Sequence, residues 1–128
     1  MNSAAKPQQP VDDAQLDAMH QRIFFLLEHA NQQAGQAFAP AFMELVSAIE
    51  QDFRREEQLM ETFQCADTHT HREQHARMQA GLHHAESALM QGNAEPAGQA
   101  LEALAEWLPF HISTQDRHLV SALRSALS

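Results

Sequence analysis

Polar side chains stand on the face of this chain that should be buried. Apolar residues recur at three- and four-residue steps in four stretches of the sequence, and this spacing marks the buried face of a helix. An ionised carboxylate in a dry interior costs several kcal/mol unless it is paired, hydrogen-bonded or bound to a cation. The polar residues in phase with the apolar ones are His20, Asp52, Glu56, His71, His75, His111 and Asp116. Their positions predict a charged centre inside a helical bundle.

A metal ion is the expected counter-charge for this centre. The chain has only eight Lys and Arg residues. Two of them, Arg54 and Arg55, adjoin Asp52 but lie on other sides of the helix, because adjacent positions diverge by about 100°. His71 and His75 are spaced i, i+4, so both imidazoles can reach one ion beside the same helix face. A carboxylate pair with the same spacing begins at Asp52, and together the pairs predict a metal site.

Composition and helix-breaking residues predict an all-α fold. Apolar residues make up 44% of the 128, there are four Gly and five Pro, and Tyr is absent, which is typical of a helical protein. Residues 1–11 are polar and contain proline, so we expect a disordered lead before a single domain over 12–128. Short loops favour an up-down-up-down four-helix bundle with a short C-terminal helix extension. The helices are expected at 12–33, 40–64, 67–91 and from 96 onward, with Asp12 or Asp13 and Asp67 or Thr68 as N-caps and Gly92 and Asn93 as a C-terminal stop.

The spacing of His111 and Asp116 predicts an irregular helix. Five residues on a regular α-helix separate two side chains by about 140°. A π-bulge, with hydrogen bonds from i to i+5, returns both to one side, and such bulges favour functional sites. Pro109 loosens the same turn, because it lacks a backbone donor and clashes with the carbonyl of Ala105. We therefore expect a wider helical turn between His111 and Asp116.

Charge and hydropathy exclude several classes of protein. The formal net charge of −9 argues against a nucleic-acid surface or an anionic membrane face and favours cation binding. No apolar run approaches the roughly 20 residues of a membrane span, and the N-terminal stretch lacks the apolar region of a signal peptide. We therefore expect a cytoplasmic protein without a nucleic-acid or membrane partner. The single Cys65 excludes an intrachain disulfide, and we interpret it as an incidental thiol.

The motifs resemble those of bacterial hemerythrins. The segment DFRREEQLM is similar to the family pattern HFxxEExxM, and LAEWLPFHISTQD is similar to WLxxHIxxxD. An HxxxH pair lies between these segments, and a lone histidine on the first expected helix precedes them. The resemblance extends from residue 13 to about residue 120, so the chain is similar to a hemerythrin over most of its length.

The resemblance implies a non-haem di-iron centre, bridged by an oxo group and carboxylates, that binds O2. The side chains that resemble the terminal ligands of the first iron are His71, His75 and His111. Glu56 and Asp116 resemble the carboxylates that bridge both irons. The expected cofactor is therefore two Fe ions, with Mn or Zn as alternatives.

The resemblance also assigns residues around the second iron. His20 resembles a ligand of that iron. Trp107, Leu108 and Ile112 resemble the apolar lining around the O2 position, although ordinary core packing is the alternative for these three. The other histidines are expected to be solvated: His29, His69, His83, His84 and His118.

Asp52 is the one departure from the family's ligand pattern, which has histidine four residues before the bridging glutamate. An Asp carboxylate reaches less far than an imidazole, and its harder oxygen favours Fe(III) over Fe(II). The leading hypothesis is a protein that binds or senses O2. A di-iron oxidase, ferroxidase-like or peroxide-handling enzyme is the alternative, as is a mononuclear metal site if Asp52 abolishes the second position. The expected partner is O2, a related diatomic or peroxide.

Overall fold

Helices make up every regular element in the part of the chain that the structure describes. The computed structural model describes residues 13–63 and 65–127, so the expected disordered lead and the candidate cap Asp12 lie outside the described residues. The elements are α1 (Asp13–Asn31), the 3-10 turn η2 (Gly35–Ala37), α2 (Phe38–Phe63), α3 (Thr68–Met90), α4 (Glu95–His111), the π-helical turn η3 (Ile112–Asp116) and α5 (Arg117–Leu127). The prediction of an all-α fold is confirmed.

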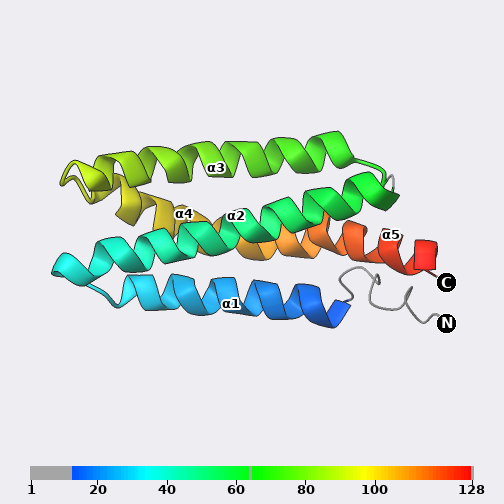
Figure 1. Ribbon diagram of the computed structural model, residues 1–128, viewed down its shortest axis with the longest axis horizontal. Coiled ribbons are helices and arrows are strands. Elements are labelled where there is room, and N and C mark those ends of the chain that lie inside the picture. Colours follow the sequence, from blue (N-terminus) through cyan, green and yellow to red (C-terminus); the bar gives the residue numbers. More distant parts are fainter. Residues whose placement is uncertain (1–12, 64, 128) are drawn as a thin grey trace, which may run out of the picture.

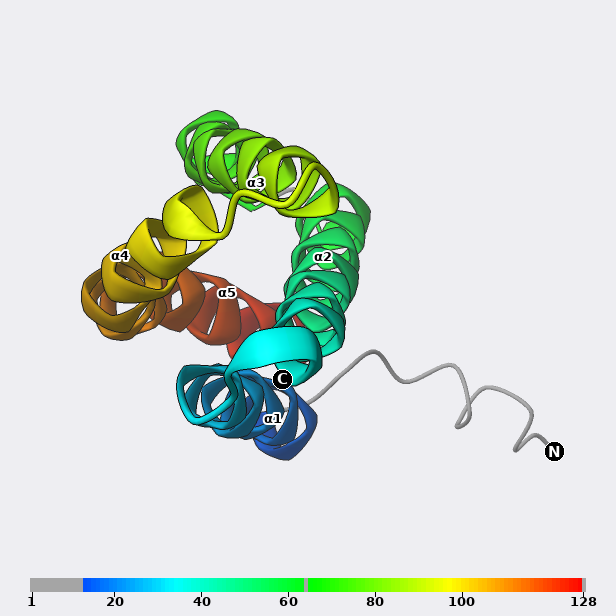
Figure 2. The ribbon, with the colours of Figure 1, turned by 90° about the vertical axis from the view of Figure 1, so that its left-hand side faces the viewer.

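The four long helices form an up-down-up-down bundle. Successive helices run in opposite directions, and α5 continues the path of α4 toward the end of the bundle at which α1 begins (Figure 1). Seen along the bundle, α1, α2, α3 and α4 follow one another around a common axis (Figure 2). Each of the four contacts both of its neighbours in this order. Four helices therefore surround the interior, and α5 is the expected C-terminal extension.

The helices begin and end within two residues of the positions expected from the sequence. Gly92 directly follows the C-cap of α3 with a φ angle of +89°, which explains why glycine ends this helix. Gly35, with φ of +60°, begins the turn η2 in the connection between α1 and α2. Asp67 precedes α3 in a left-handed conformation with φ of 62° but makes no hydrogen bond as a side-chain cap. Instead the Thr68 hydroxyl donates to the carbonyl of Cys65 at 2.7 Å. Asp67 therefore occupies the predicted N-cap position of α3, but the side-chain hydrogen bond expected of a helix cap is absent there.

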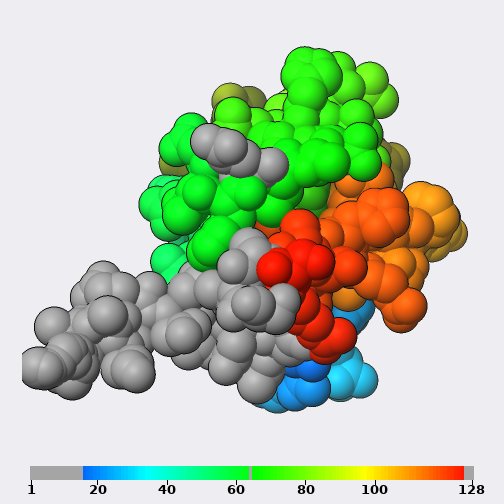
Figure 3. All heavy atoms as spheres, turned by 90° about the vertical axis from the view of Figure 1, so that its right-hand side faces the viewer, coloured from blue at the N-terminus to red at the C-terminus, as the bar shows by residue number. Residues whose placement is uncertain are grey.

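Cys65 contributes to the packing at one end of the bundle. It is half-buried and packs against a small apolar cluster between α1, α2 and α5. Burial raises the pKa of its thiol, which lowers its reactivity because the thiolate is the nucleophile. The core of this small cluster consists of Leu16, Leu59, Met60, Leu119 and Leu123. In Figure 3, which faces this end of the bundle, α5 is drawn in red and orange beside the green ends of α2 and α3.

A larger apolar cluster fills the rest of the bundle, and a polar layer separates the two. On α2 the larger cluster reaches Phe53 and the small one begins at Leu59, with Glu56 between them. On α1 the polar residue is His20, between Leu16 and Ile23. Burying such a layer is unfavourable unless its charges are compensated. The apolar packing on both sides holds the polar side chains in place.

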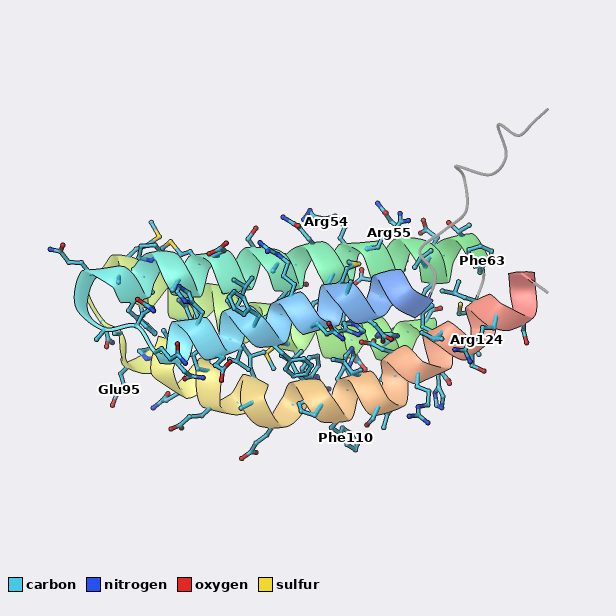
Figure 4. All side chains as sticks on the ribbon, turned by 90° about the horizontal axis from the view of Figure 1, so that it is seen from below. Arg54, Arg55, Phe63, Glu95, Phe110 and Arg124 are labelled. Carbon is cyan, nitrogen blue, oxygen red and sulfur yellow. The ribbon has the colours of Figure 1, made fainter. Side chains whose placement is uncertain are left out.

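The two arginines next to Asp52 do not supply that compensation. Arg54 and Arg55 point away from the bundle (Figure 4), whereas Asp52 is buried.

No helix among the described residues has the length and apolar character needed to cross a membrane.

Candidate metal centre

The polar residues of the four helices converge at one level of the bundle. They form two groups, in each of which one potential ligand atom per residue lies within 4.8 Å of the others. The three-histidine group contains Glu56, His71, His75, His111 and Asp116. The one-histidine group contains His20, Asp52, Glu56 and Asp116. All seven side chains are buried, and two carboxylates belong to both groups.

A π-helical turn brings His111 and Asp116 together. Residues Ile112–Asp116 form this turn, and the Nε2 of His111 lies 3.2 Å from Oδ1 of Asp116. The carbonyl of Phe110 accepts hydrogen bonds from the hydroxyls of Ser113 (3.1 Å) and Thr114 (2.8 Å). The prediction of a wider turn is confirmed. The two hydroxyls satisfy the carbonyl of Phe110 where the regular pattern of backbone hydrogen bonds is interrupted.

Within the three-histidine group the imidazole nitrogens face the same carboxylate oxygens. The Nε2 of His71 lies 2.9 Å from Oδ1 of Asp116 and 3.4 Å from Oε1 of Glu56. The Nε2 of His75 lies 3.1 Å from the same Glu56 oxygen and 3.2 Å from Nε2 of His111. Five donor atoms therefore enclose one small volume.

The one-histidine group uses the opposite oxygens of the shared carboxylates. The Nε2 of His20 lies 3.0 Å from Oε2 of Glu56, 3.1 Å from Oδ2 of Asp116 and 3.5 Å from Oδ2 of Asp52. Glu56 and Asp116 thus each turn one oxygen toward His20 and the other toward the three histidines. Each of the two carboxylates could therefore offer one oxygen to an ion in either group.

The histidine tautomers fit a cation. The Nδ1 of His75 lies 2.8 Å from Oε2 of Glu57, and the Nδ1 of His111 lies 2.8 Å from Oε1 of Gln74. Because an ionised carboxylate only accepts, Nδ1 of His75 donates to Glu57 and its Nε2 carries a lone pair; the Gln74 oxygen permits the same tautomer for His111. In that pair of tautomers two lone pairs face each other at 3.2 Å, an arrangement that a cation bound between them and the carboxylates would stabilise. Oriented imidazoles of this kind are typical of metal-ligating histidine.

Unpartnered polar atoms give a second test of the fit. Five buried atoms make no hydrogen bond among the described residues, although several lie within 3.5 Å of an opposite group. They are Oδ1 of Asp52, Oε1 of Glu56, Nε2 of His71 and both carboxylate oxygens of Asp116. Buried polar groups are nearly always satisfied, so these atoms also fit metal ligation.

Comparison with known families agrees with this geometry. The family model of the hemerythrin HHE cation-binding domain matches residues 11–123. The chain belongs to the hemerythrin family. No curated protein and no solved structure matches it. The matched residues of this hemerythrin domain include both donor groups, and the family together with the buried cluster indicates a metal-binding bundle with a metal cofactor.

Aromatic rings cover one side of the three-histidine group in this hemerythrin. Phe53 stacks on His75 with ring centroids 3.8 Å apart and planes at 3°, and Trp107 stacks on His111 at 4.2 Å and 13°. Phe53 also meets Trp107 edge to face at 6.0 Å. Stacked rings exclude water from this side and fix the planes of both imidazoles.

The one-histidine group lies beside a surface pocket of about 590 Å³ between α1 and the segment from α4 to α5. His20 and Asp116 line it, as do the exposed Ser113 and Arg117. Of the three residues expected around O2, Ile112 also lines this pocket. Trp107 lies over His111, and Leu108 belongs to the larger apolar cluster.

Sequence reasoning missed Glu57 and Gln74, which hold the two imidazoles. Each adjoins a residue assigned to the centre, Glu56 and His75, so each lies about 100° away from the predicted buried face. The second glutamate of the EE pair was the available signal for Glu57. Other histidines expected to be solvated are exposed, apart from the half-buried His29.

Two histidines of the centre, His20 and His71, have raised pKa values. Burial disfavours charge on His20, yet the facing carboxylates, Asp116 first among them, raise its pKa to about 12. Burial acts on His71 in the same direction, but Asp116 and Glu56 outweigh it and raise the pKa to about 9. Burial lowers the pKa of His75 to about 2, and the charge of His71 adds to the effect. These shifts favour the charged imidazolium form, with both ring nitrogens protonated, at His20 and His71 of the metal-free protein.

Metal loading is expected to release these protons, because a ligating imidazole is neutral at the atom that binds the ion. Metal affinity should therefore fall as the pH is lowered. Protonated His20 and His71 stabilise the metal-free fold at pH values below the ordinary histidine pKa, and this stabilisation is lost as the pH rises toward the pKa values of these residues in the folded protein. Calorimetric titration with Zn²⁺ in buffers of different ionisation enthalpy measures the release. A binding enthalpy independent of the buffer would contradict it.

Proposed function

We propose that this hemerythrin is a non-haem di-iron protein that binds or senses O2. The observation that carries the proposal is the shared pair of carboxylates, Glu56 and Asp116, each of which directs one oxygen to each donor group. A pair of iron ions bound there would supply the redox chemistry that O2 binding needs. The ligands would be His71, His75 and His111 on one side and His20 with Asp52 on the other.

The two positions differ in their donors and in their access to solvent. The three-histidine group offers five residues and the one-histidine group four, so the second leaves more room for an added ligand. The pocket at His20 and Asp116 reaches the same position from the surface. Phe53 and Trp107 cover the other side. A small molecule such as O2, a related diatomic or peroxide would therefore enter beside His20.

The test is metal analysis combined with O2 mixing. Protein purified in air is expected to contain close to two irons per chain and to show the visible absorption of a di-ferric site. Stopped-flow mixing of the reduced protein with O2 should give a persistent oxygenated spectrum. One metal or fewer per chain would favour the mononuclear alternative and remove the basis for O2 binding. Mn or Zn in place of iron would also remove the basis for O2 binding.

A second candidate function is oxidase chemistry, in which the centre oxidises Fe(II) or consumes peroxide. Asp52 favours it, because a third carboxylate beside His20 stabilises the ferric state. The surface pocket beside His20 favours it too, since water could reach the site through such an opening. Multiple turnovers that disappear in Asp52→Ala would support this function, whereas strictly stoichiometric oxidation would contradict it.

Replacing Asp52 with histidine is expected to slow oxidation of the reduced protein in air by about tenfold. The replacement removes one anionic oxygen donor and installs a softer, longer ligand, and a change of 1.4 kcal/mol in the relevant barrier corresponds to this factor. The rate is followed by the growth of the di-ferric absorption after addition of air. Asp17→Asn, which changes an exposed carboxylate lining the pocket, is the matched control and should leave the rate near that of the wild type.

A further inference from the structure

Two hydrogen-bond partners hold neighbouring imidazoles of the three-histidine group, and they differ in chemistry. Glu57 Oε2 lies 2.8 Å from Nδ1 of His75, and Gln74 Oε1 lies 2.8 Å from Nδ1 of His111. A carboxylate accepts hydrogen bonds only, whereas an amide presents an oxygen that accepts or, after a half-turn, an NH2 group that donates. The two imidazoles are therefore constrained to different degrees.

His75 has one available tautomer. Its Nδ1 faces the Glu57 carboxylate, so this nitrogen must donate and Nε2 must carry the lone pair. Arg72 lies 4.0 Å from the other oxygen of Glu57, and its charge opposes the rise that burial causes in the pKa of this carboxyl. His75 is also clamped against Phe53. Its Nε2 therefore presents a lone pair to the centre whether or not an ion is bound.

His111 has two available tautomers. With the Gln74 oxygen accepting from Nδ1, Nε2 of His111 presents a lone pair to an ion. With the amide turned, Gln74 donates to Nδ1, and Nε2 carries the hydrogen. That hydrogen has acceptors within reach, because Nε2 of His75 and Oδ1 of Asp116 each lie 3.2 Å away. The second tautomer removes the repulsion of two facing lone pairs without a metal.

We propose that Glu57 and Gln74 are positioning residues with different tasks: Glu57 fixes the tautomer of His75, and Gln74 lets His111 change tautomer when metal binds. The proposal rests on metal binding by the three-histidine group. It explains how this buried layer satisfies its hydrogen bonds in both the metal-free and the metal-loaded protein. The Gln74 amide relieves the repulsion between lone pairs in the metal-free protein, and the Glu57 carboxylate keeps His75 preorganised as a ligand.

Nitrogen-15 NMR of the histidine rings tests the proposal in the metal-free protein and after addition of Zn²⁺, which is diamagnetic. In the metal-free protein we expect the hydrogen of His75 on Nδ1 and that of His111 on Nε2. With Zn²⁺ both rings should carry it on Nδ1. A metal-free His111 with its hydrogen on Nδ1 would overturn the role of Gln74, and a metal-free His75 with its hydrogen on Nε2 would overturn that of Glu57. Absence of Zn²⁺ binding with the expected metal-free tautomers would refute the metal centre and support the hydrogen-bond assignment.

Variants separate positioning from surface charge. Glu57→Gln is expected to weaken Zn²⁺ binding by about 10- to 100-fold, as is typical for partners of metal-ligating histidine, and to allow the Nε2–H tautomer of His75. Glu61→Gln is the matched control, because Glu61 also pairs with Arg72 but is highly exposed and contacts no histidine of the centre. Equal losses in the two variants would overturn the role of Glu57. Gln74→Glu should hold the hydrogen of His111 on Nδ1 in the metal-free protein, and retention of the Nε2–H form there would count against the role of Gln74.

Discussion

Glu56→Ala is expected to remove both ions from the purified protein. Glu56 supplies one oxygen to His71 and His75 and the other to His20, so its loss takes a donor from each position. Affinity should fall by more than about 100-fold, beyond the 10- to 100-fold typical of residues that only support a ligand. Metal content per chain by elemental analysis measures the effect.

The metal-free form of Glu56→Ala should differ little in stability from the metal-free wild type. Glu56 is fully buried, and burial raises the pKa of its carboxyl well above the usual range, so its removal relieves a desolvation cost. The same change leaves a cavity and takes away a partner 3.0 Å from Nε2 of His20, which opposes that gain. Chemical denaturation after chelation compares the two proteins, and a large loss of stability would show that Glu56 has a structural role apart from metal.

Asp52→Ala is the matched comparison for Glu56→Ala. Asp52 belongs only to the one-histidine group, so this variant should keep the ion of the three-histidine group and lose the other. Retention of two ions in Glu56→Ala, or loss of both in Asp52→Ala, would contradict the bridging arrangement.

The fold and the donor residues were predictable because both depend on local periodicity. The polar residues occupy the same helix faces as Leu16, Ile23 and Leu108, and any bundle that buries those faces brings the polar groups inward. The π-helical turn was also predictable from the five-residue spacing of His111 and Asp116, because a regular α-helix cannot direct both side chains to the same site.

The remaining features depend on how the helices are rotated and placed against one another. Glu57 adjoins Glu56 and points about 100° away from it, so its contact with His75 is decided by the rotation of α2 relative to α3. The pocket beside His20 depends on how α5 lies against α1. The left-handed conformation of Asp67 arises from the path of the α2–α3 connection. Sequence periodicity carries none of this information.

Removal of metal is expected to lower the melting temperature of the wild-type protein by about 10 to 20 °C. An ion present at a thousandfold excess over its Kd stabilises the fold by about 4 kcal/mol, and for a chain of 128 residues each kcal/mol corresponds to several degrees. The physical origin is the polar layer between the two apolar clusters, where Oε1 of the buried Glu56 lies 3.1 Å from the lone pair on Nε2 of the buried His75. Thermal unfolding followed by circular dichroism, with and without chelator, measures the shift. Glu56→Ala should melt at the same temperature under both conditions, and identical curves for the wild type would show that the layer is stable without metal.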